Sequence, residues 1–225
     1  ITTSCKTGKN IDRIHTLFKT LPSKHITISD VNIPQKIKNV SILSYIECVY
    51  TVMGVGLVIT GTLGTSCTGI NVGSTLYIGP FGVEKLYMVQ VRVKGLHDNF
   101  RNSVQSIEPG NSFCANVRGI DKIITKDDIR KGHIVTSDRN LVLKMSRTFL
   151  AKIKILNLKT TIGIGYTPVI HYRTIRQAAK IIHIDVPNNE NDNTVIRGDQ
   201  DAIVKFEFVN RPEYIEQDAQ LFFRD

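Results

Sequence analysis

The chain has 225 residues, of which 41% are hydrophobic and 22% charged, which suits one large globular domain or two small ones. This composition excludes a disordered chain, a collagen and a coiled coil. Lysine and arginine total 29 against 20 acidic residues, a net charge of +9. That excess favours an anionic partner such as RNA without identifying it.

One segment near the N-terminus has the period of an amphipathic helix. The apolar residues at positions 11, 14, 17, 18 and 21 fall on one face of such a helix. Asn10 is placed to cap its first turn, and Pro22 is placed to end it. The spacing therefore predicts a single helix from Ile11 to Leu21.

Most of the chain beyond this helix has the period of two that β-strands show. Apolar and polar side chains alternate at 89–94 and 204–208, and a similar alternation runs through 149–156. Short strands separated by Gly, Pro, Asn and Asp turns, without helical crossovers, predict antiparallel barrels or sandwiches. A polar stretch at 137–140 is the expected boundary between a glycine-rich first barrel and a second one.

The run from Cys48 to Val83 contains no charged side chain. Repeated glycines interrupt it, and its threonines and valines favour strands, so we expect buried sheet here and not a membrane span. No cationic and apolar signal sequence stands at the N-terminus. These features predict a cytoplasmic protein without a membrane partner.

The sequence lacks the usual arrangements of catalytic and metal-binding residues. Four dispersed cysteines without a C-x-x-C pattern indicate neither a zinc site nor a disulfide framework. No P-loop, H-E-x-x-H or G-x-S-x-G motif occurs. His171 and His183 are interpreted as satisfied histidines of strands, and Asp127-Asp128 as a turn. We therefore expect no catalytic residue and no metal site in this chain.

Charge is distributed unevenly along the chain. Residues 139–185 hold nine basic side chains and one acidic one, whereas the last forty residues hold four and nine. A basic stretch beside an acidic one is compatible with a positive face for a nucleic-acid backbone. It is equally compatible with a solvated surface that has no partner.

Several glycine-containing motifs resemble one family. The segments GVGLVITG at 54–61 and GINVGS at 69–74 resemble the opening hairpin of the second domain of translational GTPases of the elongation factor Tu and elongation factor one-alpha superfamily. Three later segments match the end of that barrel in order and spacing: PG at 109–110, VRGI at 117–120 and DIRKGHIV at 128–135. Gly110, Gly119 and Gly132 lie where such a barrel must turn sharply.

The resemblance continues over almost the whole chain. GYTPVIHYRT at 165–174 is similar to a strand of the third domain of this superfamily, and the segments at 198–199, 204–209 and 221–224 resemble its closing section. SCKTGKNID at 4–12 resembles the end of the GTPase domain. Four further segments resemble the eukaryotic branch called GTP-binding protein one and two: 76–80, 91–97, 175–178 and 211–214.

The resemblance implies a mainly β fold with two antiparallel barrels, which correspond to the second and third domains of a translation factor. A helix that is the C-terminal part of a P-loop GTPase domain precedes them in the chain. The resemblance implies three parts: the end of the GTPase domain at 1–29, a barrel at 30–140 and a barrel without its last strand at 141–225. The chain starts after the P-loop, the switch regions and the N-K-x-D motif of the family. We therefore expect this chain not to hydrolyse GTP alone, and whether it counts as an enzyme stays open.

For ligands and partners, the resemblance implies GTP with Mg²⁺ in the complete protein, an aminoacyl-tRNA or a tRNA-like protein, and the ribosome, but not DNA. Only Ser4, Cys5 and Lys6 of the nucleotide site are present, with Cys5 where the family usually has Ala.

The expected RNA-binding residues are Arg173, Arg176, Lys94 and His97. Arg173 matches the arginine of the family's third-domain strand. In a regular strand Arg173 and Arg176 point to opposite faces, so both reach one surface only through a bulge or bend. The alternative for each arginine is an exposed side chain that pairs with a barrel carboxylate.

A second interpretation of the whole chain remains open at this point. It is a stand-alone β-barrel module derived from a translational GTPase, which binds a protein or serves as a structural component.

Overall fold

A computed structural model describes residues 2–20, 41–155, 161–186, 195–197 and 201–224. The chain forms two compact units, Ile1–Lys38 and Asn39–Asp225. Expected features at Leu21, Pro22 and residues 198–199 lie outside the described residues.

The first unit contains helix α1, Ile11–Thr20. The predicted helix is confirmed, but the predicted cap is wrong. The Asn10 side chain donates from Nδ2 to the carbonyl of Thr2 at 2.8 Å, and its backbone has a φ of 61°. Asn10 therefore fastens the preceding turn to the chain start instead of accepting from the first helical turn. No residue of α1 is buried.

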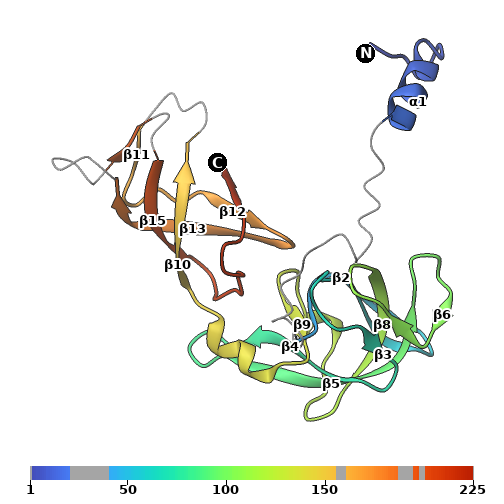
Figure 1. Ribbon diagram of the computed structural model, residues 1–225. Helices are drawn as coiled ribbons and strands as arrows, with labels where there is room; N and C mark the ends of the chain where they lie inside the picture. Colours follow the sequence, from blue (N-terminus) through green and yellow to red (C-terminus); the bar gives the residue numbers. More distant parts are fainter. Residues whose placement is uncertain (1, 21–40, 156–160, 187–194, 198–200, 225) are drawn as a thin grey trace. The chain divides into compact units, whose positions relative to one another are not determined.

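Six strands of the second unit close into an antiparallel barrel (Figure 1). Their order is β4-β9-β1-β2-β8-β5, and the barrel closes because β4 pairs with both β9 and β5. The six are β1 Leu43–Val52, β2 Gly56–Leu63, β4 Thr75–Phe81, β5 Tyr87–His97, β8 Ser112–Gly119 and β9 Ile134–Thr136. The short elements are β3 Ile70–Asn71, β6 Ser103–Val104, β7 Ser106–Ile107 and the 3₁₀ helix η1 Lys126–Asp128.

The interior of this barrel follows the predicted alternation. Val89, Val91 and Val93 of β5 are buried, while Arg92 between them is exposed. The charge-free run supplies β2, β3 and β4, as expected for buried sheet. In the described part of the chain, no helix has both the length and the apolar character needed to span a membrane.

The second group of strands forms an open half-barrel. Its main sheet has the order β10-β15-β13-β12-β16, with β10 and β16 at its edges, and β11 pairs with β14 beside it. The 3₁₀ helix η2, Arg139–Lys144, leads into it from the first barrel. Its strands are β10 Thr148–Lys154, β11 Ile162–Gly163, β12 Val169–Tyr172, β13 Ile175–Asp185, β14 Val195–Ile196, β15 Asp201–Phe208 and β16 Phe222–Arg224. The fold is therefore the predicted pair of β domains, with the second one open.

The half-barrel packs around β15, whose Val204, Phe206 and Phe208 are completely buried, as the alternation predicts. The prediction of satisfied histidines is wrong for His171, whose buried Nε2 has no hydrogen-bond partner among the described residues. His183 is exposed on β13. Asp127 and Asp128 lie in η1, in agreement with the predicted turn.

A continuous core joins the two groups of strands. The ring of Tyr45 from β1 lies 5.6 Å from that of Tyr172 and 6.4 Å from that of Tyr214, between ring centroids. Beside these rings, the Arg130 guanidinium donates to both carboxylate oxygens of Glu213, at 2.9 and 3.1 Å. The Gly132 amide also donates to Thr174 Oγ1 at 3.1 Å. The two β domains are thus held together by polar contacts as well as by packing.

Candidate nucleic-acid interface

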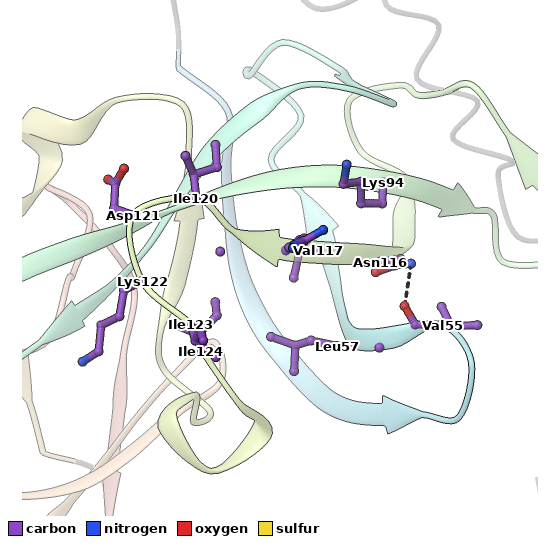
Figure 2. Close-up of a pocket in the computed structure, with 13 residues that line it drawn as sticks. Val55, Leu57, Lys94, Asn116, Val117, Ile120, Asp121, Lys122, Ile123 and Ile124 are labelled. Carbon is purple, nitrogen blue, oxygen red and sulfur yellow. Dashed lines mark hydrogen bonds between the residues drawn. The ribbon is translucent and has the colours of Figure 1, made fainter.

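A cavity of about 680 Å³ opens on the first barrel. Its walls come from the start of β2, from Lys94 on β5, from the end of β8 and from the loop that follows β8 (Figure 2). Asn116 of β8 donates from Nδ2 to the carbonyl of Val55 at 3.1 Å, the dashed line in Figure 2. This bond ties the β1–β2 turn to the neighbouring strand and fixes one wall of the cavity.

The loop that completes the cavity, 119–124, depends on a glycine. A Cβ at Gly119 would collide with the carbonyl oxygen of Lys122, so only glycine lets the loop fold back this tightly. Its φ is not positive, unlike those of Gly110 and Gly132 at 80° and 93°. Of the three glycines expected at sharp turns of the barrel, Gly110 and Gly132 have a positive φ, whereas Gly119 is needed because it leaves space for the loop.

The cavity combines apolar walls with a cationic rim. Leu57, Val117 and Ile124 line it, and Ile123 stands 87% exposed at its edge. Three lining side chains are cations, Lys94, Arg118 and Lys122, against the single carboxylate of Asp121. An apolar surface bordered by cations suits a ligand that is both flat and anionic, such as a nucleotide.

A bulge in β5 directs Lys94 toward this cavity. The pairing of β5 with β8 shifts register between Val93 and Gly95, which leaves Lys94 without a partner residue. Such bulges reorient a side chain relative to the regular pleat. In Figure 2 the Lys94 side chain stands on β5 above Val117 and Asn116.

Two arginines face each other beside Lys94. Arg92 of β5 and Arg118 of β8 are direct cross-strand partners, and both are exposed. In the described part of the chain, neither of them nor Lys94 forms an ion pair. Like charges in directly opposed positions destabilise a sheet unless an anion lies between them. The arrangement is therefore suited to a phosphate.

The predicted RNA-binding residues fall in two places. Lys94 and His97 both lie exposed on β5, but only Lys94 lines the cavity. Arg173 lies in the half-barrel, in the two-residue connection between β12 and β13, with a φ of 51°. Arg176 follows on β13, exposed and opposite His171. Because a hairpin turn separates the two arginines, the strand geometry expected for them does not apply.

Arg173 lines a second cavity, of about 600 Å³, between the first barrel and the half-barrel. The Tyr172 hydroxyl, which hydrogen-bonds the Arg173 guanidinium, raises the pKa of that arginine, and the Glu216 carboxylate adds to the shift. Tyr172 itself donates to Glu216 Oε1 at 3.0 Å. Glu47 also lines this cavity. Arg173 therefore lies near two carboxylates, those of Glu47 and Glu216, in this second cavity.

The three residues expected at a nucleotide site lie in the first unit. Ser4 Oγ accepts from the Thr7 amide at 3.3 Å, and the Ser4 amide donates to the Lys9 carbonyl at 3.2 Å. Cys5 and Lys6 are exposed in this turn. These contacts fold residues 4–9 into a turn, and the sequence contains no G-x-x-x-x-G-K-[ST] segment that could hold phosphates.

Sequence reasoning missed Arg92 and Arg118 as a pair, because their opposition depends on the register of two strands. The outward position of Arg92 between two buried valines was a usable signal. The link between Arg130 and Glu213 joins residues 83 positions apart and left no pattern in the sequence.

Comparison with known proteins gives a consistent result. Residues 142–225 match the family model of the elongation factor Tu C-terminal domain. GTP-binding protein 1 of Xenopus laevis is 32% identical over 180 residues, which are 80% of this chain and 25% of that protein. Elongation factor 1-alpha of Thermococcus onnurineus is 33% identical over 137 residues, 60% of this chain and 30% of that protein. Elongation factor 1-alpha of Natronomonas pharaonis is 29% identical over 205 residues, 90% and 45% respectively. The chain thus spans between a quarter and a half of the length of these relatives.

Proposed function

We propose a function from the premise that this chain belongs to the C-terminal β domains of the translational GTPase superfamily. It is the part of an elongation-factor-like GTP-binding protein that holds an aminoacyl-tRNA or a tRNA-shaped protein at the ribosome, in the cytoplasm. GTP hydrolysis belongs to a GTPase domain of the complete protein.

The observation that carries this proposal is the cationic cavity of the first barrel. Lys94 and Arg118 on its rim, with Arg92 opposite Arg118, have no carboxylate partner within the described residues. Phosphates of an RNA strand supply the missing negative charge, and the apolar wall around Leu57 and Ile123 supplies a surface for a base. Arg173 and Arg176 on the half-barrel, together with His97, are proposed as further backbone contacts.

GTP and Mg²⁺ have only a partial site in these residues. We propose that Ser4, Cys5 and Lys6 contact the guanine base, but the sequence contains no G-x-x-x-x-G-K-[ST] segment to hold the phosphates and the metal. When bound, GTP supplies the free energy of its hydrolysis to the complete protein. The contribution of the present residues to that chemistry is limited to contact with the base.

Binding of tRNA measured at several salt concentrations tests the proposal. Each phosphate contact contributes about 0.7 to 0.9 to the slope of log affinity against log salt. Lys94→Gln and Arg118→Gln should each lower affinity and reduce the slope by about one contact. Lys205→Gln, at an exposed position of β15, is the matched control and should leave the slope unchanged. Affinity that does not fall with salt, or that is equal for a DNA duplex, contradicts the proposal.

A protein partner is the second candidate, because exposed apolar side chains surround the same cavity. Met53 in the β1–β2 turn is 97% exposed, and Val55 and Ile123 are 51% and 87% exposed. Groups of exposed apolar residues commonly mark interfaces between proteins. This candidate corresponds to the stand-alone interaction module. It gains support if tRNA affinity is insensitive to Lys94→Gln and Arg118→Gln while Met53→Ser and Ile123→Ser abolish binding of a tRNA-shaped release-factor-like protein.

A further inference from the structure

The hairpin that joins β5 to β6 ends in a tightly bonded tip, residues 98–102. The Arg101 amide donates to the Asp98 carbonyl and the Asp98 amide to the Asn102 carbonyl, each at 3.1 Å. Asp98 Oδ1 accepts from the amides of Phe100 and Asn102, both at 2.8 Å, and Oδ2 accepts from Asn102 Nδ2 at 3.1 Å. The Asp98 carboxylate thus accepts three hydrogen bonds from within the tip, and these bonds fix the shape of the tip.

Arg101 occupies a backbone conformation that normally selects glycine. Its φ is 68°, in the left-handed region. The hydrogen-bonded residues Asp98 and Asn102 enclose three residues, 99–101, and hairpins with a loop of this length commonly place a left-handed residue at the last of the three. Glycine reaches this region without strain, whereas an arginine there costs on the order of 1 kcal/mol. Strained residues of this kind are concentrated at functional sites. Folding of the hairpin therefore does not explain why an arginine stands here.

The tip presents an aromatic ring and a cation to solvent. Phe100 is 83% exposed, and within the described residues its ring contacts no other ring or cation. Arg101 is exposed beside it and forms no ion pair in that part of the chain. Hydrogen bonds from Asn102 and Phe100 hold the pKa of Asp98 below its usual value, although partial desolvation opposes them. The one carboxylate of the tip is thus already bonded within the tip.

The surroundings of the tip decide which kind of partner it fits. It extends β5, the strand that carries Lys94 into the cationic cavity, and His97 lies between the two. A ring and a guanidinium on a cationic strand are complementary to an unpaired base and its phosphate. A protein partner with an apolar surface would leave the Arg101 guanidinium without a counter-charge.

We propose that the β5–β6 tip is a second RNA contact, in which Phe100 stacks on an unpaired base of the RNA and Arg101 binds an adjacent phosphate. This proposal rests on the proposed function and extends it from the cavity along β5. Base stacking on an aromatic side chain makes binding selective for unpaired over fully paired RNA.

The test uses the whole 225-residue chain, unfractionated tRNA and a fully paired RNA duplex. Phe100→Ala should weaken tRNA binding about tenfold, which corresponds to 1.4 kcal/mol, and leave duplex binding unchanged. Phe100→Trp should keep the affinity. Since the chain has no tryptophan, this variant also gives a single fluorophore, whose emission should fall when a base stacks on it.

Arg101→Gly separates the role in binding from the role in folding. Glycine relaxes the backbone, so this variant should melt no lower than the unchanged chain while tRNA affinity drops about threefold or more. Leu143→Ala and Lys144→Ala are the matched controls. They alter an exposed apolar and cationic pair in η2, where Leu143 is 82% exposed.

The possible outcomes separate this inference from the proposed function. If tRNA binds, and Phe100→Ala behaves as Leu143→Ala does, the tip contact is refuted and the cavity proposal stands. If Phe100→Ala weakens duplex and tRNA equally, or if saturating tRNA leaves the Phe100→Trp emission unchanged, stacking is refuted. If the unchanged chain binds no tRNA, both this inference and the proposed function fail. If the tip binds only a protein partner, this inference alone fails.

Discussion

Replacement of Arg130 should lower the free energy of unfolding, because it leaves the buried Glu213 carboxylate without its charged partner. The Glu213 side chain is only 3% exposed and accepts two hydrogen bonds from Arg130 and one from Gln177, at 3.1 Å. In Arg130→Met, Gln177 remains as its only side-chain donor within the described residues. Loss of one partner of a buried ion pair costs about 3–5 kcal/mol, a large part of the stability of a domain.

The double variant Arg130→Met/Glu213→Leu tests the physical reason. It removes both charges, so no unpaired carboxylate stays in the interior, and the pair is replaced by apolar groups of similar size. Gln177 stays bonded, since its Nε2 donates to the Arg211 carbonyl and its Oε1 accepts from the Asn210 and Arg211 amides. We expect the double variant to lie within about 1.5 kcal/mol of the unchanged chain.

Urea unfolding at pH 8, followed by circular dichroism, measures both variants. The free energy of unfolding comes from the midpoint and the slope, and an unchanged slope shows that the same surface is exposed on unfolding. A single variant that loses less than about 1 kcal/mol would mean that water or a rearrangement satisfies Glu213, or that its carboxyl group binds a proton once Arg130 is gone. A double variant as unstable as the single one would mean that the contacts of Arg130, and not its charge, hold the two β domains together.

Three further predictions concern the same unit of the chain. Burial raises the pKa of Glu213 to about 7, against the opposing effect of Arg130. The folded chain therefore binds a proton at Glu213 more tightly than the unfolded chain, whose glutamates titrate near 4.3. The contribution of this carboxyl group to the free energy of unfolding should fall as pH rises from about 4.5 to 7. Glu213→Gln should flatten that part of a plot of the urea midpoint against pH. Phe206→Ala, in the completely buried centre of β15, should cost about 3–5 kcal/mol in urea, whereas Leu150→Ala, exposed on the paired strand β10, should cost less than about 0.5. Gly119→Ala should force the loop at 119–124 away from its position, because the added methyl group would collide with the Lys122 carbonyl. We expect weaker tRNA affinity with a melting temperature lowered by only a few degrees, which would show that the cavity wall is affected more than the core. Unchanged tRNA affinity would contradict the role of that loop.

The sequence predicted the features that depend on neighbouring residues. Alternation of Val89, Val91 and Val93 with polar residues was enough to place β5, and the same pattern at Val204, Phe206 and Phe208 was enough to place β15, because one face of each strand is buried. The resemblance to translation factors added the pairing of the strands into two groups, which periodicity by itself could not provide.

Features that depend on register and on distant residues could not be predicted. The position of Lys94 depends on a bulge, and the opposition of Arg92 to Arg118 depends on the alignment of two strands. Arg173 was expected on a strand but lies in a turn, because β12 ends one residue earlier, at Tyr172. Phe100 gave no periodic signal, since its exposure results from the way Asp98 closes the hairpin tip.

The different closure of the two sheets has a consequence for the behaviour of this chain in solution. Every strand in the ring of the first barrel has neighbours on both sides, so that ring cannot serve as a template for another polypeptide. In the described part of the half-barrel, β10 and β16 each have an unpaired side, and Leu150 and Phe222 on these two strands are both 68% exposed. Self-association at high protein concentration should therefore begin at these two strands, and a lysine placed on either of them should keep the isolated chain monomeric for longer.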